Sequence, residues 1–272
     1  MMRILLLAPI YNSLYARLVA KGILEGKGLD LTGIVVRSHL NPDRFRSELN
    51  RDGPRLLRKI LEKLFLGDNH FEDKLNDNLN SLAKTNGLDI KTLPRLCRDK
   101  AIPFSLVRDL NSPRSLAFIK NLKPDVIVFT GGGLIRKQIL AIPRLGVLNC
   151  HSGILPSYRG MDVVEWTAAE GNAFSVGFGV TQHQMDNGVD TGPILQKENI
   201  TIQKGDTFQS IRERIEVLMV RLMLSGLRSL QDGKIHLMEQ TPHAGRQYFV
   251  MHPRIRQYAE KRLKQDSLQE SN

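Results

Sequence analysis

The sequence predicts an α/β protein with a Rossmann-like, mostly parallel central sheet and helices on both faces. One indication is the strand, helix and strand pattern at the amino terminus, over Arg3–Pro9, about Asn12 to Glu25, and Leu29–Arg37. A second is Pro124–Thr130, a short apolar run rich in β-branched residues. Such runs are typical of strands that are buried on both faces of a parallel sheet.

The rest of the chain continues this alternation. Helices are expected at Leu93–Arg98, Ser112–Leu122, Asp162–Glu170 and Phe208–Leu230, and strands at Ile102–Val107, Phe174–Gln184 and Gly192–Ile202. Gly233 should end the long helix, so we assign residues 1–233 to one domain. Residues 234–272 form a basic carboxy-terminal extension with a short helix at Pro253–Lys264.

Residues 41–87 are predicted to be a helical insertion. Apolar residues recur at helical spacing over Pro54–Leu66 and again over Phe71–Ala83. The many Arg and Lys residues of this segment could grip an anionic polymer. These basic residues are also explained by helices that expose one charged face to solvent and pack an apolar stripe on the core or on a second subunit. We favour that interpretation.

The composition indicates a cellular compartment more clearly than it indicates a binding partner. A net charge of +11 favours anionic partners such as nucleotide sugars, tRNA, polyglutamylated folate or an acidic membrane surface, although a plain basic surface accounts for it as well. Two cysteines, Cys97 and Cys150, form no disulfide framework, which favours a reducing cytoplasm. No stretch of the sequence is long enough to span a membrane, and Ile4–Pro9 is too short for a signal sequence.

Polar residues follow the apolar run Gly146–Leu148, where a buried strand should end. Alternate side chains of a strand share a face, so Asn149 and His151 should point one way and Cys150 the other. An amide can stabilise a developing oxyanion, and a neighbouring imidazole can exchange a proton or donate to the same oxygen. The alternative is a hydrogen-bonded pair at a strand end with a structural role only.

Together with a second segment, these residues resemble a known family. The motifs are Asn-x-His, Leu-Pro-x-x-x-Gly, Gly-Val-Thr-x-His and Asp-x-Gly-x-Asp-Thr-Gly, and they match in order and spacing across residues 124–205. The sequence is similar to the 10-formyltetrahydrofolate-dependent formyltransferases. This superfamily includes glycinamide ribonucleotide, methionyl-tRNA and amino-sugar-nucleotide formyltransferases.

The resemblance implies a catalytic set of Asn149, His151 and Asp190. A primary amine would attack the formyl carbon of 10-formyltetrahydrofolate, and Asn149 and His151 would hold the resulting oxyanion. Asp190 would pair with His151, raise its pKa by opposite charge, and help to move the amine proton. No compact metal-ligand spacing is present, so no metal is expected.

The resemblance also implies a folate-binding region. Gly133, Leu134 and Ile135 would line the pterin pocket, and the turn that contains Asp186 and Val189 would lie against the pterin ring. Asp186 can equally be a simple turn or cap residue. His183 falls on a family position too, although a buried strand histidine accounts for it as well.

The acceptor amine is chosen by elimination. Glycinamide ribonucleotide enzymes of the superfamily have a Gly-x-Gly-Ser-Asn turn after the first strand, where this chain has Ala8–Ser13. Methionyl-tRNA enzymes add a carboxy-terminal domain of about a hundred residues, and only residues 234–272 follow Gly233 here. We therefore expect an anionic small-molecule amine, such as an amino-sugar nucleotide, and no membrane partner; a nucleic acid is the less favoured alternative.

Several alternatives stay open. Glycinamide ribonucleotide and methionyl-tRNA are the other acceptors within the superfamily. From other classes, a 10-formyltetrahydrofolate hydrolase that releases formate and a non-catalytic folate-binding protein are also compatible with the motifs. The sequence leaves open whether the protein is a homodimer.

Overall fold

The computed structural model describes residues 1–38, 78–89, 91–131, 133–241 and 244–269, and the structural statements below refer to these residues. The predicted helix at Pro54–Leu66 lies outside them, as does most of the predicted insertion at 41–87. The described end of that insertion contains helix α4 (Leu79–Thr85), which begins with Asn78 as its cap.

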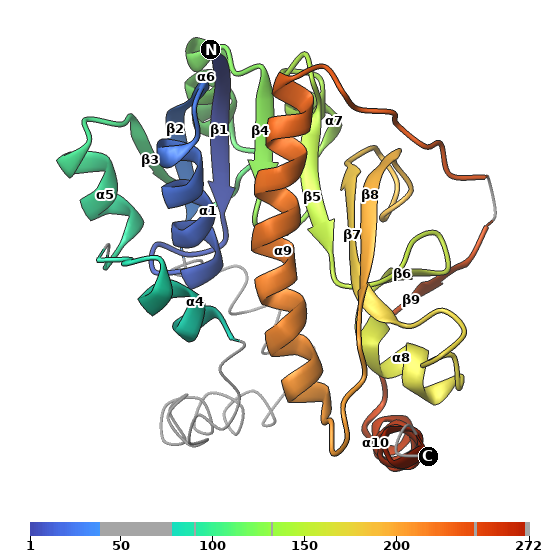
Figure 1. The fold of residues 1–272 in the computed structure, drawn as a ribbon. Coiled ribbons are helices and arrows are strands. Elements are labelled where there is room, and N and C mark those ends of the chain that lie inside the picture. Colours follow the sequence, from blue (N-terminus) through green and yellow to red (C-terminus); the bar gives the residue numbers. More distant parts are fainter. Residues whose placement is uncertain (39–77, 90, 132, 242–243, 270–272) are drawn as a thin grey trace.

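A seven-stranded sheet forms the centre of the molecule, in the order β3-β2-β1-β4-β5-β7-β8 (Figure 1). Neighbours from β3 through β5 in this order are parallel, and β7 and β8 continue the sheet as antiparallel strands. The prediction of a mostly parallel sheet is confirmed. The strands are β1 (Met2–Ala8), β2 (Leu29–Arg37), β3 (Phe104–Val107), β4 (Val126–Phe129), β5 (Val147–His151), β7 (Phe178–Gln184) and β8 (Ile194–Ile200).

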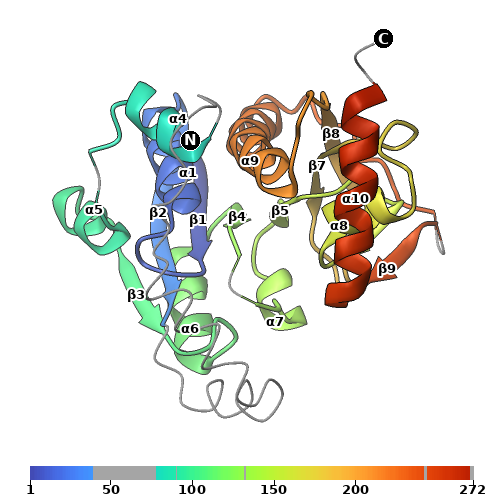
Figure 2. The same ribbon diagram turned by 90° about the horizontal axis from the view of Figure 1, so that it is seen from below.

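Helices cover both faces of this sheet, as expected, because successive strand side chains point to opposite faces (Figures 1 and 2). Ile4 and Leu6 of β1 join an apolar cluster with α1 (Leu14–Glu25) and α9 (Phe208–Gln231), whereas Leu5 and Leu7 join a second cluster on the other face. That second cluster includes residues of α6 (Pro113–Leu122) and α7 (Lys137–Leu140). Helix α5 (Leu93–Asp99) precedes β3 at the edge of the sheet.

The strand order indicates where this sheet would bind a ligand. β1 lies between β2 and β4, so the chain leaves β1 in one direction and β4 in the other. Open α/β sheets bind ligands at such a switch point, outside the carboxyl ends of the strands. Ser13, which caps α1 by accepting a hydrogen bond from the Ala16 amide, lies after β1, and Thr130 follows β4.

A second, two-stranded sheet pairs β6 (Tyr158–Gly160) with β9 (Arg246–Tyr248) in parallel. The sequence predicts neither strand, because three-residue strands show no readable alternation. Gly160 has φ of +96° and would place a Cβ atom 2.2 Å from the Tyr248 carbonyl oxygen, so only glycine lets β9 approach this closely. The carboxy-terminal segment is therefore packed against the loop that follows β5.

The segment ends in α10 (Pro253–Gln269), which lies beside α8 (Val163–Ala169) (Figure 2). This helix is longer than the predicted Pro253–Lys264. Two hydrogen bonds fasten the connection, from the Trp166 indole to the Phe249 carbonyl and from the Met251 amide to Asp162. Across the described residues, no helix combines the length and apolar character that a bilayer crossing requires.

Candidate active site

Asn149 and His151 lie on the same face of β5, and Cys150 packs into the core on the opposite face. This confirms the predicted alternation. β5 lies between β4 and β7 in the sheet. The register of its pairing with β7 places Asn149 opposite His183 and His151 opposite Thr181. Directly opposed residues of two strands share a face, so the pairing brings His183 beside the asparagine.

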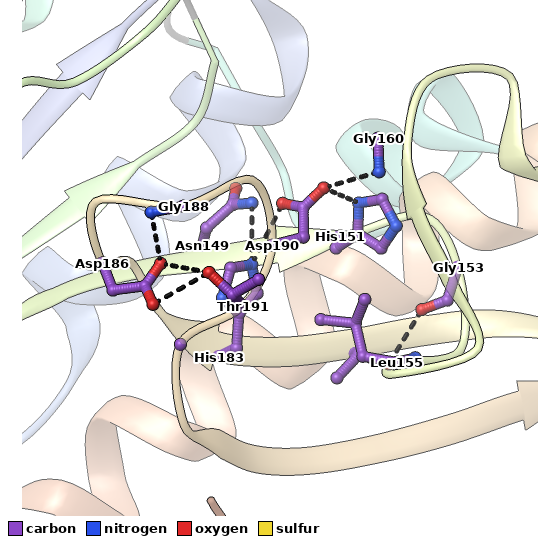
Figure 3. A network of polar contacts seen from close by, with 12 residues as sticks. Asn149, His151, Gly153, Leu155, Gly160, His183, Asp186, Gly188, Asp190 and Thr191 are labelled. Atoms are coloured by element: carbon purple, nitrogen blue, oxygen red, sulfur yellow. Dashed lines mark hydrogen bonds and ion pairs between the residues drawn. The ribbon is translucent and has the colours of Figure 1, made fainter. Parts of the chain in front are cut away.

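Asp190 reaches these residues from the loop between β7 and β8, which folds over the face of β5 (Figure 3). Its Oδ2 atom lies 3.4 Å from Nδ1 of His151, and its Oδ1 atom lies 3.5 Å from Nε2 of His183. The Gly160 amide donates a hydrogen bond of 2.9 Å to the same Oδ2 atom. The amide, the imidazole and the carboxylate that the motifs singled out are therefore neighbours in space.

His183 is a further member of the site. Its Nδ1 atom lies 2.8 Å from the Gln184 carbonyl, which can only accept, so Nδ1 carries the proton. Nε2 then accepts from the Asn149 amide nitrogen at 3.3 Å. The sequence places His183 on a family motif position within a strand, but its contact with Asn149 depends on the strand register.

The Nε2 atom of His151 lies 2.8 Å from the carbonyl oxygen of Tyr158, in β6. That oxygen also only accepts, so the neutral ring carries its proton on Nε2 and leaves Nδ1 free to take up a second proton. Nδ1 is the atom that faces Asp190. Proton uptake at Nδ1 would create an imidazolium beside a carboxylate.

Two opposing effects determine the pKa of His151. Asp190 does raise the pKa of His151, but burial of the ring lowers it by more, so the net pKa lies below the ordinary value of 6.5. For Asp190, burial opposes ionisation, yet its neighbours His183 and His151 and the hydrogen bond from the Gly160 amide together lower its pKa to about 2. The site at neutral pH thus holds a neutral His151 beside an ionised Asp190.

The residues expected to bind folate differ in their exposure to solvent. Leu134 is 80% exposed, whereas Ile135 is buried in the core cluster that α6 and α7 cover. The two side chains therefore do not share one apolar surface. Gly133 has φ of +107°, a conformation that favours glycine.

The other expected folate-binding residues lie in the loop that carries Asp190. Asp186 accepts hydrogen bonds from the Gly188 amide and the Thr191 hydroxyl, which makes it the residue that shapes this turn (Figure 3). The side chain of Asp186 is occupied by the turn itself, and Val189 is half-buried next to Asp190.

A cavity of about 370 Å³ opens beside Asn149 and His151. It lies at the switch point of the sheet, between the start of α1 and the first turns of α9. Its volume falls in the range of small-molecule sites. Residues that line it include Ser13, Tyr15, Thr130, Ser152, Arg212 and Glu216.

Cys150 is a core residue despite its place in the chain between Asn149 and His151. Burial raises the pKa of its thiol to about 12, so it is a poor nucleophile, as expected from its orientation toward the core. Within the described ranges, the His, Cys, Asp and Glu side chains form no group of three or more with the geometry of a metal site.

Comparisons by sequence and by structure both find proteins that are named as formyltransferases or transformylases. Residues 103–227 match the formyl transferase family. A methionyl-tRNA formyltransferase of Thermotoga maritima is 31% identical over 140 residues, which are 51% of this chain and 44% of that protein. The chain thus spans less than half the length of this relative.

Solved structures show the same fold at low sequence identity. Glycinamide ribonucleotide transformylase 1 of Symbiobacterium toebii superposes with a TM-score of 0.56 at 18% identity, over 88% of this chain and 95% of that one. A sugar N-formyltransferase of a Shewanella species also gives 0.56, at 14% identity, over 97% and 88% of the two chains.

Proposed function

We propose that this chain, whose residues 103–227 match the formyl transferase family, transfers a formyl group from 10-formyltetrahydrofolate to a primary amine. The observation that supports this most directly is the convergence of Asn149, His151 and Asp190 from two separate segments. The relative from Thermotoga maritima, a methionyl-tRNA formyltransferase, is a formyl-transferring enzyme by name.

In this proposal the bound donor supplies an activated formyl group, whose carbonyl oxygen gains negative charge when an amine attacks. Asn149 stabilises that charge by donating from its amide nitrogen, which His183 holds in place by accepting the other N–H. The low-dielectric surroundings of the buried His151 and His183 strengthen this interaction.

His151 takes up the proton that the amine loses. Its Nε2 proton is directed at the Tyr158 carbonyl, so the base is Nδ1, and its lowered pKa keeps it neutral at pH 7. Asp190 stabilises the imidazolium that forms and orients the ring. The imidazolium can then donate to the same oxyanion or return the proton to the leaving nitrogen of the folate.

The pterin of the donor is proposed to bind along the segment Gly133–Ile135 and the turn that contains Asp186 and Val189. Leu134 suits this role because it is a large apolar side chain in contact with solvent. Asp186 contributes through the backbone, since its carboxylate is already bonded to Gly188 and Thr191.

The acceptor is proposed to be a small-molecule amine that binds in the cavity at the switch point. Arg212, which pairs with Glu165, brings a guanidinium to the wall of this cavity, where an anionic acceptor such as a nucleotide sugar would bind, and Ser13 and Thr130 offer hydroxyl groups. Methionyl-tRNA is the second candidate, favoured by the identity to the relative from Thermotoga maritima. The tRNA would have to present its aminoacyl end to the same cavity.

Incubation of the purified chain with 10-formyltetrahydrofolate and a panel of acceptors tests the proposal. The panel contains amino-sugar nucleotides, glycinamide ribonucleotide and charged methionyl-tRNA, and both tetrahydrofolate and formate are followed. Amine-dependent release of tetrahydrofolate without formate supports a transferase. Formate release without an amine would identify a hydrolase, and tight folate binding without turnover would identify a binding protein.

A further inference from the structure

The segment after α9 returns to the candidate active site, where the Gln240 side chain contacts the loop that carries Asp190. Met238 forms a two-way backbone bridge with Ile194 at the start of β8, with both N–O distances at 2.8 Å. Two residues later, the Gln240 side chain donates from Nε2 to the carbonyl oxygens of Asp190, at 3.0 Å, and Gly192, at 2.7 Å. Both acceptors belong to the loop that carries the proposed catalytic carboxylate.

Asp190 needs such support because its backbone is strained. It has φ of +54°, a left-handed conformation that non-glycine residues adopt only at an energetic cost. The conformation persists only where the surroundings hold it. Two hydrogen bonds from one amide nitrogen, to carbonyls on either side of Thr191, hold the backbone at this point.

The same segment supports the opposite side of the site. β9 pairs with β6, and β6 supplies both the Tyr158 carbonyl that fixes His151 and the Gly160 amide that bonds to Asp190. Tyr158 and Tyr248 stack with ring centres 5.2 Å apart, and both hydroxyl groups donate to Glu170. The carboxy-terminal segment is thus connected to His151 and Asp190 by direct hydrogen-bond paths.

We infer that Gln240 is a positioning residue of the active site, which fixes the Asp190 loop so that its carboxylate faces His151 and His183. This role rests on the proposed formyl transfer for its effect on rate, but the placement of Asp190 can be measured without any acceptor. Gln240 touches only backbone carbonyls, so its contribution is to geometry. A displacement of 1 Å in a reacting group can cost about a hundredfold in rate.

The test uses Gln240→Met in the full chain, because methionine has nearly the same length and no donor. Gln247→Met is the matched control, since Gln247 is exposed in β9 of the same segment. Two quantities are measured: kcat and KM with 10-formyltetrahydrofolate and an active amine, and the titration of His151 by NMR of labelled imidazoles. Asp190→Asn provides the reference for a lost carboxylate.

We expect Gln240→Met to lower kcat about tenfold with KM changed less than about twofold, because the loss is one of alignment. The pKa of His151 should shift downward, in the direction of Asp190→Asn, because the displaced carboxylate raises it less. The thermal unfolding midpoint should match that of the control. If Gln240→Met does not fold, Gln240→Asn is tested by the same criteria, since its shorter amide cannot span both carbonyls.

The inference is overturned if both kcat and the His151 titration of the variant equal those of Gln247→Met. In that case wild-type turnover would leave the proposed function standing. If the wild-type chain transfers no formyl group to any acceptor, the proposed function fails, and the His151 titration alone decides: a downward shift supports the positioning role, and an unchanged titration refutes it.

Discussion

Nδ1 of His151 lies 3.4 Å from Oδ2 of Asp190, and the Tyr158 carbonyl accepts from the other ring nitrogen. The ring is therefore oriented from both sides, with its free nitrogen toward a carboxylate. A buried neutral imidazole in this arrangement is suited to receive a proton and to be stabilised once charged. This relationship gives the proposed reaction its base.

Asp190→Asn should lower kcat by about 10²–10³, within the range of general acid–base catalysis, because the imidazolium loses its counterion. KM for the donor should change little, since Asp190 is not proposed to bind folate. Steady-state kinetics check this, with Asp99→Asn on the exposed end of α5 as the control. A variant with wild-type kcat would remove Asp190 from the mechanism.

The pH dependence of kcat/KM should reflect the burial of His151. The proposed transfer requires neutral His151, and its pKa lies below 6.5, so the midpoint of the acid limb of kcat/KM should lie below that value. Asp190→Asn removes a charge that raises the pKa, so the midpoint should move to still lower pH. An acid midpoint above pH 6.5 in the wild-type chain would contradict this account.

His183→Leu should lower kcat about tenfold while the fold persists, because the Asn149 amide loses the acceptor that orients it. The loss should be much smaller in an Asn149→Ala background, since the two side chains act through one hydrogen bond. A double-mutant cycle measures this. Equal losses in both backgrounds would show that His183 acts independently of Asn149.

Stability should depend strongly on one buried ion pair away from the cavity. Arg214 of α9 is 6% exposed and pairs with Asp206, which is 8% exposed. Arg214→Met should lower the free energy of unfolding by about 3–5 kcal/mol, because it leaves a buried carboxylate uncompensated. Asp206→Asn in the same chain should restore part of the loss in urea titrations. No recovery would indicate that packing, and not the charge, is responsible.

The fold could be predicted from the sequence where the patterns are long. β2 at Leu29–Arg37 and the start of α9 at Phe208 agree with the hydrophobic periodicity, because each buries a regular apolar face. β6 and β9 could not be predicted, since each is three residues long and is stabilised by its partner. Their pairing depends on Gly160, whose close contact with Tyr248 exists only in the folded chain.

The candidate site, like the fold, could be predicted only in part from the sequence. The motifs identified Asn149, His151 and Asp190, and the structure brings them together. They did not reveal His183 as a partner of Asn149 or Gln240 as a support of Asp190, because both roles arise from strand register and from the path of the carboxy-terminal segment. The effect of Asp190 on the pKa of His151 was predicted, but the larger and opposite effect of burial depends on the packed structure.

The central claim is that Asn149, His151 and Asp190 surround one reacting carbonyl. It is tested most directly by the amine-dependent release of tetrahydrofolate from 10-formyltetrahydrofolate, measured for the wild-type chain and for Asn149→Ala. We predict a loss of about 10²–10³ in kcat with a native circular dichroism spectrum, as when an oxyanion donor is removed. A well-folded Asn149→Ala protein that transfers formyl groups at the wild-type rate would contradict the account.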